Sequence, residues 1–82
     1  MKINILFFSN LKQYSKNFTL CLENTNELTL LELQNILVQK IPELKNILNN
    51  IAFAINQEYV ANSNVKIVDH DEVALIPPVS GG

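Results

Sequence analysis

The apolar residues of this chain change their spacing along the sequence, and that change restricts the fold more than any other feature. Residues 3–8 and 18–23 alternate side chains between two faces, which is typical of strands, and the short connection between them predicts a hairpin. Residues 29–41 instead carry leucines and isoleucines three and four positions apart, which is helical spacing. Residues 51–55 and 72–76 return to short apolar runs typical of strands. The sequence therefore predicts an α+β domain in which one helix packs on a sheet.

The start and the end of the helix are both marked. Thr29 followed by Glu32 matches a capping box, in which each side chain accepts a hydrogen bond from the other residue's backbone N–H. Leu28 and Leu33 occupy the positions of a hydrophobic staple. Pro42 disfavours helical geometry at the residue before it. We expect the helix to begin at Thr29 and to end just before Pro42.

Several shorter segments complete the expected order. Residues 24–27 are turn formers, residues 42–48 predict a further short helical turn, and residues 59–60 and 65–68 predict short strands. The run 72–76 is apolar on both faces, which favours a central strand. Leu6 and Phe8 are also apolar on the outward side of the first strand. That strand is therefore either central or carries a contact patch.

The size and charge of the chain exclude several classes of protein. With 82 residues there is room for one core, so a two-domain enzyme with a deep private pocket is not expected. The net charge of −2, with lysine as the only basic side chain type besides one histidine, argues against nucleic-acid binding. No apolar run is long enough for a membrane helix, and residues 1–8 lack the cleavage site of a signal peptide. Cys21 is the only cysteine, which favours a reducing, cytoplasmic location and a partly buried structural thiol.

The C-terminal segment is unusual because the chain has two glycines and both are its last residues, Gly81 and Gly82. Pro77 and Pro78 favour an extended exit from the last strand. A tip without side chains can thread a channel too narrow for a β-carbon, and the α-carboxylate is ionised at neutral pH. Such a carboxylate can attack the α-phosphate of ATP to give an acyl-adenylate. The sequence therefore predicts a reactive terminus presented by a rigid body.

Three segments give the chain a family resemblance. Residues 5–8 (Ile-Leu-Phe-Phe), residues 54–57 (Ala-Ile-Asn-Gln) and residues 71–82, which end in Pro-Pro-Val-Ser-Gly-Gly, closely resemble the small subunits of molybdopterin synthases. The resemblance implies a β-grasp, ubiquitin-like fold with a mixed four- to five-stranded sheet packed on one main helix. It divides the chain into a domain over residues 1–76 and an extended flexible tail over residues 77–82.

The function that the resemblance implies is sulfur carriage. Gly82 would be adenylated by a ubiquitin-activating-like adenylyltransferase that uses ATP, and then converted to a thiocarboxylate. The tail would enter the large synthase subunit and donate sulfur for the dithiolene of molybdopterin, in an assembly of two small and two large subunits. The chain itself would bind no cofactor or metal and would not be catalytic alone. The expected tail residues are Pro77, Pro78, Val79, Ser80, Gly81 and Gly82.

A second candidate site consists of Phe8, Tyr59 and Ile76, which the resemblance implies to be a docking patch for both partners. His70 stands where the family usually has glycine; if the position needs a positive φ, histidine is among the more tolerant residues, and we expect modest strain there and no loss of function. The acidic run 69–72 is consecutive and has no second ligand cluster. It therefore favours a solvated turn over a metal site.

Three alternatives remain open at this point. The carrier could deliver sulfur to the thiazole of thiamine instead of to molybdopterin. The tail could form isopeptide bonds with target lysines, as in a ubiquitin-like modifier. The domain could also be a plain adaptor in which the patch binds and the tail is inert.

Overall fold

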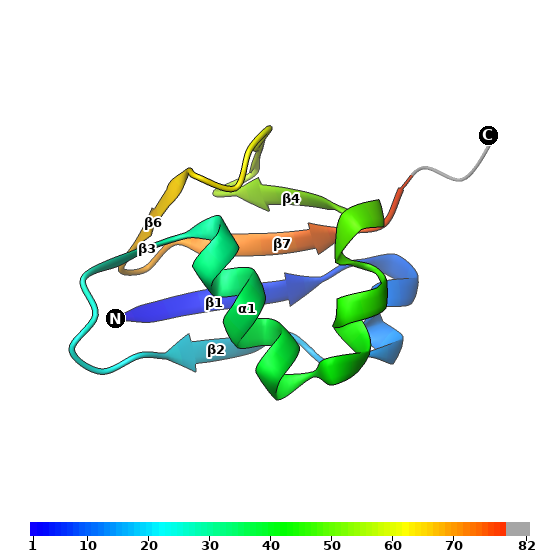
Figure 1. The fold of residues 1–82 in the computed structure, drawn as a ribbon, viewed down its shortest axis with the longest axis horizontal. Helices are drawn as coiled ribbons and strands as arrows, with labels where there is room; N and C mark the ends of the chain where they lie inside the picture. The colour runs from blue at the N-terminus through cyan, green and yellow to red at the C-terminus, as the bar shows by residue number, and fades with distance from the viewer. Residues whose placement is uncertain (79–82) are drawn as a thin grey trace.

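A five-stranded mixed sheet forms the centre of the molecule, with one helix across it (Figure 1). The computed structural model describes residues 1–78. The strand order is β2-β1-β7-β4-β5, in which β1 and β7 are parallel and the other neighbours are antiparallel. The elements are β1 (Lys2–Phe7), β2 (Phe18–Cys21), α1 (Leu30–Lys40), β4 (Ala52–Ile55), β5 (Glu58–Tyr59) and β7 (Glu72–Ile76). The predicted α+β class, the hairpin of β1 with β2 and the central position of β7 are confirmed.

A second, two-stranded sheet pairs β3 (Glu27–Thr29) with β6 (Lys66–Val68). The sequence indicated β6 but placed residues 24–27 in a turn that leads directly into the helix, so it missed the strand β3. The strand β3 is three residues long and its partner lies far along the chain, so only the tertiary pairing reveals it. Residues 1–78 also contain three 3₁₀ helices: η1 (Ser9–Gln13), η2 (Pro42–Asn46) and η3 (Leu48–Asn50).

The core lies between α1 and one face of the large sheet (Figure 1). Alternate residues of β1 and β7 are fully buried there, and the registers Ile5↔Val73 and Phe7↔Leu75 place their side chains in adjacent rows. The helix contributes three buried leucines, Leu30, Leu33 and Leu37. Because the central strands and the helix stripe meet in one cluster, the domain has the single core that its length allows.

The helix begins and ends as its sequence predicts. The Thr29 hydroxyl accepts a hydrogen bond from the Glu32 N–H at 3.1 Å, and the Glu32 carboxylate accepts one from the Thr29 N–H at 2.8 Å. This reciprocal pair satisfies two backbone donors that a helix start leaves open. The last helical residue is Lys40, two residues before Pro42. The capping box therefore fixes where β3 stops and α1 starts.

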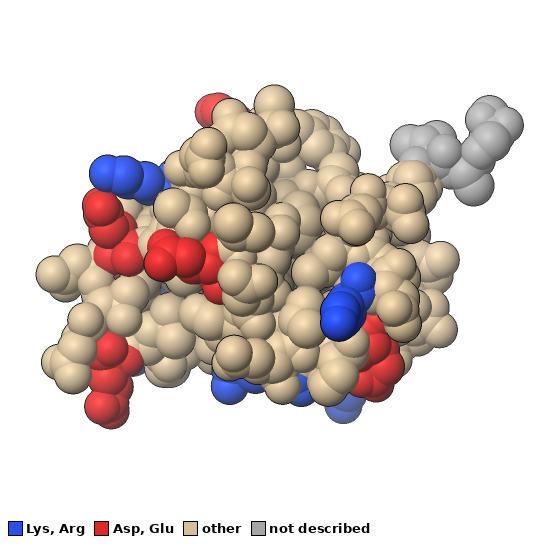
Figure 2. Space-filling view, in the orientation of Figure 1, with Lys and Arg blue, Asp and Glu red and all other residues tan. Residues whose placement is uncertain are grey.

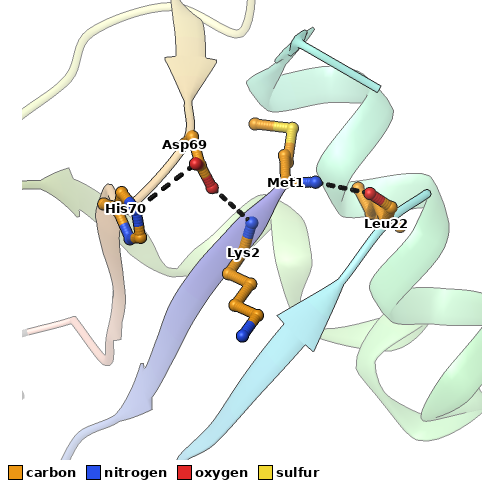
Figure 3. Close-up of polar contacts among 5 residues, drawn as sticks. All are labelled: Met1, Lys2, Leu22, Asp69 and His70. Atoms are coloured by element: carbon orange, nitrogen blue, oxygen red, sulfur yellow. Dashed lines mark hydrogen bonds and ion pairs between the residues drawn. The ribbon is translucent and has the colours of Figure 1, made fainter. Parts of the chain in front are cut away.

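The turn between β6 and β7 is tied to the start of β1 (Figure 3). The Lys2 N–H donates to the Asp69 carboxylate at 2.6 Å, and the His70 N–H donates to the Lys2 carbonyl at 2.7 Å. The hydrogen bond from Lys2 lowers the pKa of the exposed Asp69 carboxyl, and the charge of His70, 3.3 Å away, lowers that pKa further. His70 has φ = 69°, so this position does adopt a positive φ. These contacts hold a residue other than glycine in the left-handed region.

A second carboxylate ties the same turn to the neighbouring strand connection. Asp71 accepts hydrogen bonds from the Val68 N–H and from the Asn56 side-chain amide, both at 2.9 Å. The side-chain oxygen of Asn56 accepts one from the Glu72 N–H. The two aspartates of the acidic run are therefore committed to backbone and amide donors. Within residues 1–78, no group of three or more His, Cys, Asp or Glu side chains is arranged to hold a metal ion.

Candidate functional site

The face of the large sheet that points away from α1 carries apolar side chains in two rows. The first row crosses four strands, because the register joins Leu6 to Ala74, Ala74 to Ala54 and Ala54 to Tyr59. Their strand neighbours Phe7, Leu75 and Phe53 belong to the core, so side-chain alternation directs this row to the opposite side. Tyr59, at the sheet edge, is 72% exposed.

The second row lies at the ends of β1 and β7. Ile76 is paired with Ala52, and Phe8 follows Phe7, the partner of Leu75. The Phe8 N–H donates to the Leu75 carbonyl at 3.1 Å, which fixes Phe8 beside the end of β7. Phe8 is 46% exposed, whereas Ile76 is half-buried. We call the two rows together the apolar face, made of Leu6, Phe8, Ala52, Ala54, Tyr59, Ala74 and Ile76.

The structure therefore brings the three predicted docking residues onto one surface. Phe8 and Ile76 are near neighbours, and Tyr59 lies two strands from Ile76 across β4. Sequence reasoning missed the small residues between them, Ala54 and Ala74, which are each 5% exposed. Their alternation with core residues was the available signal, but alanine is among the residues most often fully buried, so this signal does not single out a surface. The two alanines occupy the middle of the first row, between Leu6 and Tyr59.

A shallow hollow of about 130 Å³ borders the apolar face beyond the end of β1. Phe8 and Lys12 both line it, so a basic side chain from η1 adjoins the aromatic end of the face. Asn17 closes the hollow and is fixed there, because its side-chain oxygen accepts a hydrogen bond from the Phe7 N–H at 2.7 Å. The apolar face therefore has a polar and basic border at this end.

The C-terminal segment leaves the sheet at the same end. Strand β7 stops at Ile76, and the described chain continues through the half-buried Pro77 to the exposed Pro78 (Figure 1). Because β1 and β7 are parallel, Phe8 and Pro77 follow adjacent strand ends. The predicted tail residues Val79, Ser80, Gly81 and Gly82 lie outside the described residues. The described chain thus points its last residues away from the sheet, beside the apolar face.

Cys21 is exposed, so the expectation of a partly buried thiol was wrong. The physical reason is that β2 is an edge strand and that Cys21 pairs with the exposed Lys2 on the side away from the core. Among residues 1–78, no helix has the length and apolar character that crossing a membrane requires.

The mixed five-stranded sheet, its single packed helix and the exit of the chain after the central strand define a β-grasp, ubiquitin-like domain. Solved structures with this fold agree. A complex of subunits 1 and 2 of molybdopterin-converting factor from Helicobacter pylori contains a chain 32% identical to this one, with a TM-score of 0.74 and full coverage of both chains. Small archaeal modifier protein 1 from Haloferax volcanii matches with a TM-score of 0.79 over 95% of this chain and 98% of its own. At 22% identity, that match shows the fold alone.

The chain belongs to the ThiS family, whose family model matches residues 5–82. Relatives named molybdopterin synthase sulfur carrier subunit align over almost the whole chain. The one from Drosophila melanogaster is 33% identical over 84 residues and covers all of this chain and 92% of its own length. Those from Arabidopsis thaliana and Homo sapiens are 34% and 30% identical and cover 100% and 99% of this chain, and 84% and 94% of their own lengths. The resemblance identified from the residues is confirmed.

Proposed function

We propose that this chain is the sulfur carrier subunit of a molybdopterin synthase. The observation that carries the proposal is that the central strand β7 ends at the border of an apolar sheet face and is followed directly by Pro77 and Pro78. A body of this shape presents a surface for docking and a chain end for chemistry. The full-length similarity to relatives named as this subunit supports the same function.

The reactive group in this proposal is the carboxylate of Gly82. One carboxylate oxygen attacks the α-phosphorus of ATP, pyrophosphate leaves, and an acyl-adenylate forms. Hydrosulfide then displaces AMP and gives the thiocarboxylate directly; where the donor is a persulfide, its outer sulfur displaces AMP and a thiol reduces the resulting S–S bond. The thiocarboxylate sulfur next attacks the pterin precursor of the dithiolene, and water cleaves the acyl–sulfur bond, which leaves the sulfur on the pterin and regenerates the Gly82 carboxylate. ATP binds to the activating enzyme in this proposal, so we expect this chain itself to bind no cofactor.

Two partners follow from this chemistry. The first is a large synthase subunit, and the two-subunit complex from Helicobacter pylori supports such a partner. The second is an adenylyltransferase of the ubiquitin-activating kind. We propose an assembly of two small and two large subunits, and a cytoplasmic location for both steps. The apolar face serves as the docking surface for both partners, which bind it in turn.

In this reaction the described residues position the C-terminal segment relative to the docked partner. Phe8 and Ile76 sit beside the point where the chain leaves the sheet, so a partner seated on the apolar face has the C-terminal segment at the border of its contact. A fixed docking point raises the effective concentration of a tethered reactive end. The proline pair favours an extended path for the first two residues of that segment.

Intact-mass measurement tests the proposal directly. The protein is incubated with the activating enzyme, ATP and a sulfur donor, and we expect a mass gain equal to one oxygen-to-sulfur exchange. Removal of Gly82 should abolish that gain and leave the unfolding transition unchanged, because no residue of the core is altered. A matched control, Ser80→Ala, retains the terminal glycines and should still be converted. A truncated chain that is still adenylated would contradict the proposal.

The same measurement separates the alternatives. A covalent adduct with another protein indicates a modifier, and an unchanged mass indicates an adaptor. Conversion to a thiocarboxylate that then supports thiazole formation, and not formation of the dithiolene, indicates a thiamine carrier. Co-purification with a large synthase subunit is the observation that favours the molybdopterin product.

A further inference from the structure

The charged side chains are unequally divided between the two ends of the sheet. The end where β1 and β7 finish, which we call the exit end, carries four of the six lysines and one of the eight carboxylates. The end where β1 and β7 begin, the far end, carries the other two lysines and seven carboxylates. Figure 2 shows this division on the helix side. Red groups gather on the left, where β1 begins, beside one blue group, and a further red group lies at the top. The other blue groups lie along the lower and right parts, with one red group among them. A chain of net charge −2 thus has a basic end.

The first two lysines of the exit end follow β1. Lys12 lies in η1, which packs against β7 and borders the Phe8 end of the apolar face. Lys16 lies in the connection to β2, one residue before Asn17, whose side chain is bonded to the Phe7 N–H. Both side chains are exposed. Both are therefore held near the point where the C-terminal segment leaves the sheet.

The other two lysines come from the helix layer. Lys40 is the last residue of α1, and Lys45 lies in η2, which packs on α1 and on η3. The 3₁₀ helix η3 leads into β4 at Ala52, the partner of Ile76, so this layer also reaches the exit end (Figure 1). Both lysines are exposed. The four lysines are thus spread around the exit on both sides of the sheet.

The two ends also differ in how their charges are used. At the far end, Lys66 pairs with Glu27 at 3.3 Å, and Asp69 and Asp71 accept hydrogen bonds within the fold. Among the described residues, neither of the two salt bridges involves a lysine of the exit end. Their positive charges remain available to a partner.

The geometry points to a partner surface that is acidic around the opening that receives the C-terminal segment. This inference depends on the proposed function and adds the charge of the docking surface to it. Lys12 makes the basic end continuous with the apolar face, because it shares a hollow with Phe8. A protein surface that seats the apolar face therefore also meets the lysines. Opposite charge at that border favours approach with the exit end first, and repels the far end.

A protein fits this surface better than a nucleic acid does. All of the basic side chains at the exit end are lysines, which act as point charges and lack the fork of arginine that suits phosphates. The apolar face beside them exposes the aromatic side chains of Phe8 and Tyr59, a residue type that is enriched at protein interfaces. Electrostatic attraction between exposed charges changes the association rate more than the dissociation rate, and salt screens it over about 10 Å at 0.1 M.

Two double variants with the same change in net charge test the inference. Lys12→Glu with Lys16→Glu reverses charge at the exit end, and Lys2→Glu with Lys66→Glu reverses it at the far end. Association with the purified large synthase subunit is followed by stopped-flow at low and high salt, after thermal unfolding has shown that both variants fold. We expect the exit-end variant to associate at least about 10-fold more slowly at low salt, and high salt to remove most of the difference. The far-end variant should change the rate by less than about 3-fold.

Equal slowing by both variants, or slowing that salt does not affect, would overturn the inference. So would lysine-dependent binding of polyuridylate RNA or of phosphatidylserine vesicles that exceeds binding of the large subunit. The mass assay on the same exit-end variant separates this failure from failure of the proposed function. At saturating activating enzyme, the variant should still gain sulfur, because its Gly82 carboxylate is unchanged. A wild-type chain that neither gains sulfur nor binds the large subunit overturns both proposals.

Discussion

Both faces of the five-stranded sheet carry apolar residues, but the two sets consist of different side chains. The covered face carries large residues such as Ile5, Phe7 and Leu75, which are at most 1% exposed under α1. The apolar face has two alanines in its middle and keeps Phe8 and Tyr59 exposed around them. The difference teaches that apolar character alone does not separate core from interface. Large side chains of the covered face interdigitate with a helix of the same chain, whereas the apolar face leaves aromatic side chains exposed, a residue type enriched at protein interfaces.

The largest effect is expected on the covered face. Phe7→Ala removes a ring that is fully buried and lies 6.1 Å from the ring of Phe18, so the free energy of unfolding should fall by about 3–5 kcal/mol. Urea unfolding followed by circular dichroism measures the loss. Phe7→Leu keeps most of the volume and should cost less, which provides a folded variant for comparison. If Phe7→Ala lowers the free energy of unfolding by less than about 1 kcal/mol, the covered face does not differ from the apolar face in its contribution to stability.

The matching change on the other face should affect binding and leave stability nearly unchanged. Phe8→Asp alters a side chain that is 46% exposed, so we expect a stability change within about 0.5 kcal/mol. Affinity for the large subunit and for the activating enzyme should fall at least about 10-fold, because an aromatic group at a docking face is replaced by a charge. Isothermal titration calorimetry measures both affinities.

Leu31→Asp is the control for that experiment. Leu31 is 49% exposed, as an outward residue of α1, and it lies on the helix side of the molecule. It should leave both affinities unchanged. If Leu31→Asp and Phe8→Asp weaken binding equally, the apolar face is not the docking surface.

A smaller effect is expected where the helix that makes the covered face begins. Thr29→Ala removes the hydroxyl that accepts from the Glu32 N–H, and should lower the free energy of unfolding by about 1 kcal/mol. Thr29→Ser keeps the hydroxyl and should recover most of that loss. Partner affinity should stay the same for both variants, because the cap acts on the helix and not on the apolar face. A change in affinity with Thr29→Ala would show that the two faces are coupled.

The smallest effect concerns the turn at the far end of the sheet, which both faces share. The pKa of Asp69 is lowered, first by the Lys2 N–H and then by His70, so its ionised form favours the folded state. That contribution is present above the ordinary pKa of an aspartate and is lost as the pH falls through the lowered folded pKa. We expect wild type to be slightly more stable than Asp69→Asn at pH 6, and the two to converge in strong acid. If the stability difference between wild type and Asp69→Asn persists unchanged in acid, its cause is the geometry of the turn and not the charge of Asp69.

Most of the secondary structure could be predicted from local pattern. Each of these signals depends on residues only a few positions apart, so it can be recognised in the sequence. They are the alternation in residues 3–8, the capping box at Thr29 and the helix end before Pro42. The strand β3 could not be predicted in this way, because three residues have no clear period and gain their hydrogen bonds from Lys66–Val68. The exposure of Cys21 depended on β2 being an edge strand, which is also a property of the whole sheet.

The candidate site divides in the same way. Phe8, Tyr59 and Ile76 could be selected from alternation together with a family resemblance, and the structure places them on one face. Ala54 and Ala74 could not, since their role depends on what lies across four strands. The basic exit end could not be predicted from the sequence either, because its lysines are spread from Lys12 to Lys45 and come together only in the fold.

The sequence by itself determined the local elements, the caps and the unusual C-terminal residues, because each depends on neighbours a few positions apart. Only the tertiary structure decided which apolar residues belong to the core and which lie on the apolar face that we propose for docking. It also decided which charges surround the point where the chain leaves the sheet. The physical reason is that burial and charge density are properties of surfaces, and a surface gathers side chains from segments that the sequence keeps far apart.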